Sequence, residues 1–169
     1  MKPEFIYNTW VNQVKRGMTD KIHSHFTPLF EEPVRIHTEE QEQAFTRPAF
    51  FVFYGYISEY PSGLRGEKRR RLSMRVRYHP SEKHGMTYDE ISAVADELDY
   101  ALNEIEVPRL TTADPEDRII VRKTDSHYVP SDNHDYLMYD VIYNIYLYEP
   151  EEEMELMEEI EINKIVNGG

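Results

Sequence analysis

The stretch YLMYDVIYNIYLY, residues Tyr136–Tyr148, decides the fold of this chain. From 137 to 147 its odd-numbered positions are Leu, Tyr, Val, Tyr, Ile and Leu, whereas the even-numbered positions between Tyr136 and Tyr148 mix Tyr, Met and Ile with Asp and Asn. Alternate side chains of a β-strand point to opposite faces, so this pattern predicts a long strand that is buried on at least one side. Val141 lies at its centre, and we expect it in the core.

Two further runs have the same character. Residues 49–60, AFFVFYGYISEY, are strongly β-prone, and residues 69–78 alternate between apolar side chains on one face and Arg or Ser on the other. These runs predict a hairpin. Its connection, from Tyr60 to Lys68, is longer than a tight turn, so we expect a protruding, mobile tip that becomes ordered when a neighbour binds it.

Two helices are expected. Residues 5–26 place an apolar side chain about every fourth position; Gly17 should weaken or kink the middle, and Thr27-Pro28 ends the helix. For the second helix, Thr87 and Glu90 form a capping box. An apolar stripe then runs from Ile91 through Leu98 to Ile105, which predicts a helix that ends before Pro108.

Short strands are predicted at 34–37 and 118–123, with a loop at 38–46 and a turn within 127–135. Strands and helices that occur in separate groups indicate an α+β fold. We therefore expect a mixed or antiparallel sheet of about 4–6 strands with two main helices on one face. Residues 1–169 are predicted to form a single domain with an acidic C-terminal segment at 149–163.

Composition excludes several classes of protein. The chain has 169 residues and no Cys, which removes disulfides, thiolate nucleophiles and cysteine-ligated metals. We find neither a signal-peptide pattern nor a run of 18 apolar residues, so we expect an intracellular product with no membrane contact. The formal net charge of −13 opposes net attraction to nucleic acid.

Charge is nevertheless divided along the chain. Residues 68–77, KRRRLSMRVR, hold six cations and no acid, whereas residues 149–161 hold eight acids and no base. The basic stretch is open to three interpretations: a solvated strand face, a protein interface, or a small nucleic-acid-binding module in which Tyr54, Tyr56 or Tyr78 stacks on bases.

Neither a catalytic nor a cofactor-binding motif is found, and no metal site is predicted. His23 and His25 splay apart on a helix. The acidic and histidine side chains of residues 125–135 suit a turn better than a metal site. Glycine-rich phosphate loops, a nucleophile elbow and an H-E-x-x-H pattern are all absent from the sequence.

The order of four segments resembles a known family. RPAFFVFY (47–54), RRLSMRVRYHP (70–80), the helix ISAVADELDYALNEI (91–105) and the closing block from Asp135 to Asn163 follow the pattern of tail terminator proteins from long-tailed bacteriophages and prophages. The resemblance covers roughly residues 18–163.

The resemblance implies a structural virion protein that uses no cofactor and is made in the host cytoplasm. Such proteins form rings, usually of six copies, that cap the head-proximal end of the tail tube, stop its polymerisation and provide the docking surface for the head completion or neck protein, while DNA passes through without specific binding. Oppositely charged segments then predict the subunit interface. Its candidate residues are Arg69, Arg71, Arg75, Arg77, Glu151, Glu152, Glu153, Glu155, Glu158 and Glu159.

Overall fold

The computed structural model describes residues 10–38, 45–61, 68–81, 86–108 and 118–147. In chain order, the elements are α2 (Trp10–Phe26), β1 (Arg35–His37), β2 (Ala49–Pro61), β3 (Lys68–His79), α3 (Tyr88–Ala101), β4 (Glu104–Pro108), β5 (Arg118–Pro130) and β6 (Leu137–Leu147). The predicted hairpin tip between 62 and 67, most of the predicted loop at 38–46, and the acidic segment at 149–163 lie outside the described residues.

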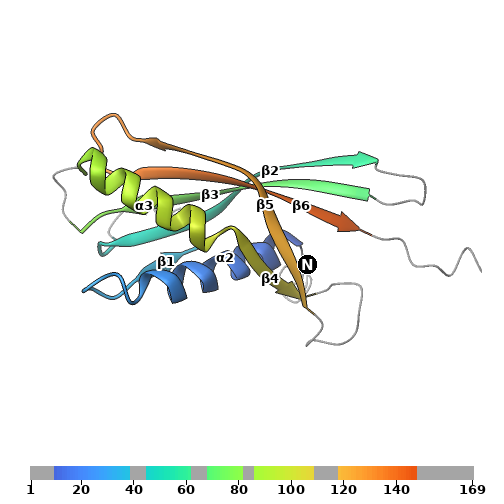
Figure 1. Cartoon of the computed structure of the whole chain (residues 1–169), viewed down its shortest axis with the longest axis horizontal. Helices are drawn as coiled ribbons and strands as arrows, with labels where there is room; N and C mark the ends of the chain where they lie inside the picture. Colours follow the sequence, from blue (N-terminus) through green and yellow to red (C-terminus); the bar gives the residue numbers. More distant parts are fainter. Residues whose placement is uncertain (1–9, 39–44, 62–67, 82–85, 109–117, 148–169) are drawn as a thin grey trace, which may run out of the picture.

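The strands form one mixed sheet of six strands in the order β1-β2-β3-β6-β5-β4. β1 pairs parallel with β2, and every other pair is antiparallel. Both helices lie on the same side of the sheet, and β2, β3 and β6 extend beyond them (Figure 1). The predicted α+β class is therefore confirmed.

The core lies between this sheet and the helices. On β6, the odd-numbered residues from Leu137 to Ile145 are at most 2% exposed, as their alternation predicts. Leu98 on α3 is fully buried as well. Tyr143 places its hydroxyl in the core, where the hydroxyl donates a 2.8 Å hydrogen bond to the carbonyl oxygen of Leu102. This bond satisfies a polar group that would be costly to bury alone, and it ties the end of α3 to the central strand.

The start of α3 matches the prediction. The Thr87 hydroxyl accepts from the Glu90 amide at 3.3 Å, and the Glu90 carboxylate accepts from the Thr87 amide at 2.7 Å. Both halves of the capping box are therefore present.

The predicted end of that helix is wrong. α3 stops at Ala101, and residues Glu104–Pro108 form β4 instead. Ile105 and Val107 fit the helical stripe by spacing, but they also alternate with Glu104 and Glu106. In a strand paired with β5, both side chains lie against α2 and are completely buried. Where a sequence fits both the helical period and the strand period, pairing with another strand decides the conformation.

The predicted turn at 127–135 is also partly wrong. β5 continues to Pro130, and the turn occupies only Ser131–Tyr136, where the Ser131 amide donates to the Tyr136 carbonyl at 2.9 Å. Residues 124–130 show no apolar alternation, because most of their side chains are exposed. Backbone pairing with β6 defines this part of the strand.

Gly17 has a different role from the one predicted. α2 runs without interruption through it, from Trp10 to Phe26; predicted residues 5–9 lie outside the described part. A Cβ atom at Gly17 would stand 2.8 Å from the backbone carbonyl oxygen of Glu106 on β4. Glycine therefore lets the helix approach the outer edge of β4 closely.

We expect Gly17→Ala to destabilise the domain by about 1–3 kcal/mol, although alanine is the better helix former by about 1 kcal/mol. The clash is with backbone, so α2 must shift away from β4. Chemical denaturation measures the change. Asp20→Ala, at an exposed position of the same helix, is the control and should change stability by less than about 0.5 kcal/mol. A Gly17→Ala protein more stable than wild type would contradict this packing.

Candidate assembly surface

Alternate residues of β3 from Arg71 to Arg77 lie on the sheet face that points away from the helices. Arg71, Arg75 and Arg77 are partly exposed, whereas Leu72, Met74 and Val76 between them are buried, so the predicted alternation is confirmed. The side chain of Arg69 lies outside the described residues, as do Glu151, Glu152, Glu153, Glu155, Glu158 and Glu159.

Arg75 already has a partner within the chain. Its Nε and Nη2 donate to the two carboxylate oxygens of Asp140 on β6 at 2.5 and 2.7 Å. These hydrogen bonds raise the pKa of Arg75; burial opposes the effect, and the charge of Asp140 adds to it. His127 on β5 approaches the same carboxylate, with Nε2 3.3 Å from Oδ2. The bidentate Arg75–Asp140 pair joins β3 to β6, and the contact of His127 with the same carboxylate extends the link to β5.

Arg77 lies between aromatic rings. Its guanidinium carbon is 5.4 Å from the centroid of Phe53 and 5.5 Å from that of Tyr136. A cation over ring faces is attracted by their negative potential. Arg77 therefore also stabilises the outer face of the sheet.

Next to Arg77, His79 lies in an aromatic cluster. Its ring centroid is 4.7 Å from that of Phe45, and its side chain is only 7% exposed. Neither ring nitrogen has a hydrogen-bond partner among the described residues. Burial, reinforced by the charges of Arg47 and Arg77 and opposed by Asp135, lowers the pKa of His79 from 6.5 to about 4.

This shift predicts a pH-dependent stability. Unfolded His79 takes up a proton below about pH 6.5, but folded His79 stays neutral down to about pH 4. The unfolded state binds more protons in that window, so stability falls as the pH decreases, by about 2 kcal/mol between pH 7 and pH 5. Urea titrations of wild type and His79→Phe at both pH values measure it. The variant should lose less stability than wild type; an equal loss in both proteins would assign the effect to other groups.

The prediction that Tyr54, Tyr56 or Tyr78 stacks on bases is wrong for Tyr78. Tyr54 and Tyr56 are 47% and 52% exposed, and Ile57 beside them is 39% exposed. Tyr78 is only 6% exposed, because it lies on the core face of β3, and burial, with Glu32 and Glu90, raises its pKa to about 12. Tyr78 therefore cannot stack on a base.

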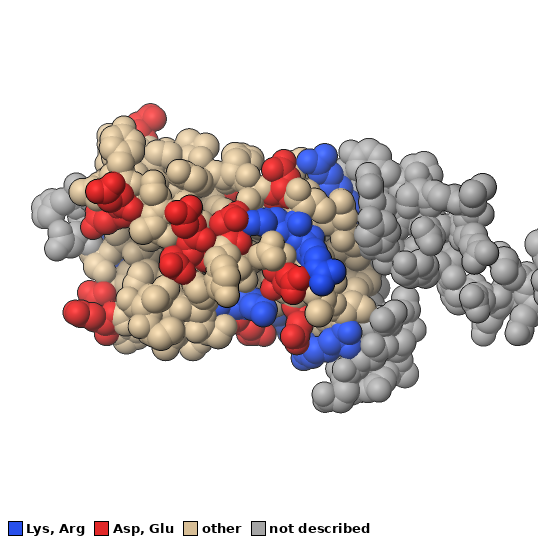
Figure 2. Space-filling view, in the orientation of Figure 1, with Lys and Arg blue, Asp and Glu red and all other residues tan. Residues whose placement is uncertain are grey.

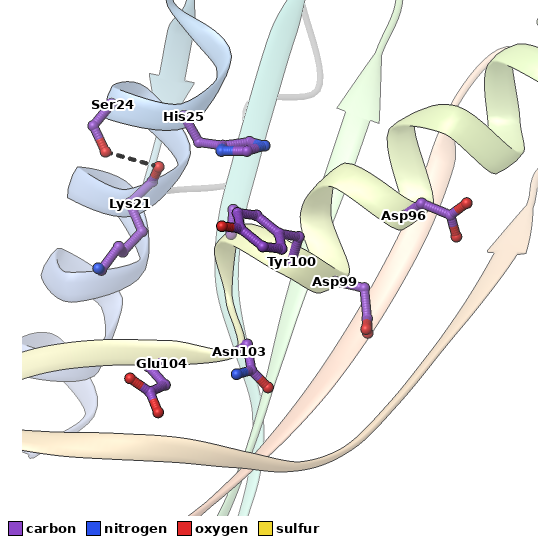
Figure 3. A pocket seen from close by; sticks show the side chains of 9 residues that line it. Lys21, Ser24, His25, Asp96, Asp99, Tyr100, Asn103 and Glu104 are labelled. Carbon is purple, nitrogen blue, oxygen red and sulfur yellow. Dashed lines mark hydrogen bonds between the residues drawn. The ribbon is translucent and has the colours of Figure 1, made fainter.

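A groove of about 640 Å³ runs between α2 and the end of α3 (Figure 3). His25 and Glu97 meet beside it at 2.5 Å, a pairing that catalytic sites also use. The neighbouring hydroxyl of Ser24 donates instead to the Lys21 carbonyl at 3.1 Å. Consecutive residues on a helix do not face each other. The geometry therefore does not place this serine as a nucleophile for His25.

Asp99, on the wall of this groove, is a structural anchor. Its carboxylate accepts hydrogen bonds from Ser126 at 2.5 Å and Tyr139 at 2.9 Å, and Lys123 lies 2.5 Å away. Burial would raise the pKa of Asp99, but the hydrogen bonds from Lys123, Ser126 and Tyr139 outweigh it and lower the pKa. The network fastens α3 to β5 and β6.

The acids and histidines of residues 125–135 do not converge. Asp125 accepts from the Ser126 amide at 2.9 Å, and His134 lies 3.2 Å from the Met86 carbonyl oxygen. Within the described ranges, no group of three or more His, Asp or Glu side chains is arranged to hold a metal ion. The helices of these ranges include none with the length and apolar character of a membrane span.

Charge is divided across the molecule. Figure 2 shows acidic side chains over the region of α3 and most of the visible Lys and Arg side chains toward the opposite end.

The intrachain partner of Arg75 was not predicted from the sequence. Asp140 is the only acid among the even-numbered positions of 136–148. That position could have identified the pair, because an acid amid apolar side chains on a strand needs a partner.

The family model described as phage tail terminator protein matches residues 13–155. One similar solved structure is the sheath/tube terminator of an extracellular contractile injection system, PVC, in its extended state, with 10% identity and a TM-score of 0.41. The alignment covers 79% of this chain and 57% of that one. No curated protein matches the chain. The family match extends over most of the sequence and confirms the resemblance found there: the chain belongs to the phage tail terminator protein family.

Proposed function

We propose that this protein forms a ring, of six copies, that caps the head-proximal end of a phage tail tube and ends its polymerisation. The family match over residues 13–155 carries the proposal. Members of the family are structural proteins of the phage tail, so the virion is where the chain acts. The exposed face of the ring would dock the head completion or neck protein, and DNA would pass through it without specific binding.

The described surface supports an assembly role. Large apolar side chains are exposed along β2 and β5, among them Tyr54, Tyr56 and Val129. Exposed apolar side chains of this size are typical of surfaces that meet another protein. Arg71 is partly exposed beside them and is available to an acidic neighbour. The acidic residues 151–159 of the next subunit are the proposed source of that charge.

A nucleic-acid-binding module is less well supported. Arg75 is neutralised by Asp140, Arg77 is held by aromatic rings, and Tyr78 is buried. The net charge of −13 opposes binding further. A salt-dependent gel shift separates the two functions, because a module should still bind DNA or RNA tightly at about 150 mM salt, whereas a terminator should not.

Native mass spectrometry tests the ring. We expect a single oligomer, dominated by the hexamer, when purified tail tubes of the phage are added. The same protein without tubes is the reference, since contact with the tube end can be required for closure. A chain that remains monomeric in the presence of tubes would contradict the proposal.

A further inference from the structure

The two sides of the sheet each expose an unpaired stretch of strand. β1 pairs with only the first three residues of β2, Ala49 to Phe51. In the part of the chain that the structure describes, the remainder of β2, Val52–Pro61, has a neighbour on its β3 side alone. We call Val52–Pro61 the β2 edge. An edge of this length presents free backbone amides and carbonyls to any strand that approaches it.

The second unpaired stretch lies on β5. β4 pairs with Arg118–Arg122, so beyond Lys123 the described strands leave β5 with β6 as its only partner. We call Thr124–Pro130 the β5 edge. By contrast, the outer side of β4 is close to α2, where the Glu106 carbonyl faces Gly17. Among the described residues, α2 therefore lies against β4, whereas no further strand lies beside the β2 and β5 edges.

Both edges carry exposed apolar side chains. On the β2 edge, Tyr54, Tyr56 and Ile57 are 47%, 52% and 39% exposed. On the β5 edge, Tyr128 and Val129 are 44% and 56% exposed. Natural edge strands are usually protected from association by charged side chains or by a covering element. Apolar side chains on open edges instead favour pairing with another strand.

The two edges also differ in charge. Beside the β2 edge, Arg70 and Arg71 of β3 stand opposite Glu59 and Ser58, so cations lie one strand away. The β5 edge carries exposed Asp125. Next to it is a hollow of about 330 Å³ that includes Asp96 of α3 together with Tyr128. A basic side and an acidic side on one molecule are complementary between successive copies.

Strand direction is compatible with such pairing. β2 and β6 each run antiparallel to β3, and β5 runs antiparallel to β6. β2 and β5 therefore run in opposite directions. Copies placed side by side with their strands aligned would bring these edges together antiparallel. The open stretches lie toward opposite ends of the sheet, so neighbours must be offset along the strands, as the strand tilt of closed barrels requires.

From these observations we infer that the β2 edge of one subunit pairs with the β5 edge of the next, so that the sheet continues from copy to copy. The inference rests on the proposed ring and identifies its contact surface. Because different surfaces meet, the contact is heterologous and can close only by completing a ring.

Cysteine cross-linking tests the pairing directly, because the natural chain contains no Cys. Tyr56→Cys and Val129→Cys proteins are prepared separately, mixed with purified tail tubes and oxidised. A disulfide-linked dimer containing one of each is expected. Tyr88→Cys mixed with Ile120→Cys, both exposed but outside the two edges, should give about 10-fold less or no dimer.

Charged substitutions give an independent test. Ile57→Lys should weaken assembly about 10-fold or more while leaving the melting of the monomer unchanged, because a lysine on the open edge opposes strand addition. Ile120→Lys is the matched control, since Ile120 is 57% exposed on the part of β5 that pairs with β4, outside the two edges. Adding Val129→Asp to Ile57→Lys should restore part of the assembly by placing unlike charges across the contact.

The results separate this inference from the proposed function. If tubes are capped and rings form but the Tyr56 and Val129 cysteines do not cross-link, the edge pairing is wrong and the terminator function stands. If Ile57→Lys rings form normally yet fail to bind tubes, the β2 edge contacts the tube protein, and pairing between copies is again refuted. Absence of both rings and capping would overturn the inference and the proposed function together.

Discussion

Val141→Asp is expected to abolish cooperative folding of the domain. Val141 is fully buried at the centre of β6, between β3 and β5 in the sheet. An unpaired carboxylate there costs several kcal/mol, against a typical total stability of about 5–15 kcal/mol, and the protein can avoid it only by unfolding or by protonating the group. Circular dichroism melting measures the loss.

Val129→Asp is the matched control, because it makes the same chemical change at a side chain that is 56% exposed. It should melt within a few degrees of wild type. Leu98→Asp repeats the experiment from the helical side of the core, since Leu98 is fully buried on α3. A near-normal melt of Val141→Asp or Leu98→Asp would remove that residue from the core.

The second large effect concerns assembly. We expect Arg69→Glu combined with Arg71→Glu to prevent ring formation and leave the monomer folded. One exposed ion pair contributes only about 0.2–1 kcal/mol, but a closed ring repeats each contact in every interface. A loss of about 1 kcal/mol per interface in a hexamer is therefore about 6 kcal/mol per ring, or roughly four orders of magnitude in its equilibrium constant.

Arg75 is unsuitable for this test, because its reversal would place a second carboxylate beside Asp140 and destabilise the fold itself. Arg118→Glu with Lys21→Glu makes the same charge change at exposed or partly exposed positions outside β3 and serves as the control. Adding Glu158→Lys and Glu159→Lys to the Arg69 and Arg71 double variant should partly restore the ring. Sedimentation velocity measures the oligomeric state of the Arg69 and Arg71 double variant, of the control and of the quadruple variant. Normal assembly of the Arg69 and Arg71 double variant would exclude these arginines from the interface.

Elements whose side chains are buried on one face were predictable. The apolar alternation of β6 and the capping box of α3 each have a local cause, so they are visible in the sequence and present in the structure. β4 and the second half of β5 were missed for opposite reasons. Ile105 fits both the helical period and the alternation of a strand. Residues 124–130 have too few buried side chains to show an apolar alternation. Only pairing with distant strands determines their conformation.

The candidate surface was predictable in outline. Arg71, Arg75 and Arg77 of β3 face away from the core, as the alternation requires. The separate contacts of these arginines were not predictable. Asp140 meets Arg75, and Phe53 meets Arg77, only because of the strand register. The open edges were invisible for the same reason, since a sequence does not show which strands lack a neighbour.

The length of tail tubes tests the central proposal most directly. Purified tube protein is polymerised with and without this chain, and tube lengths are measured by negative-stain electron microscopy. We predict that the wild-type protein stops elongation and is found at one end of the tubes, whereas the Arg69 and Arg71 double variant does neither. Tubes that continue to lengthen in the presence of excess wild-type protein would contradict the terminator function.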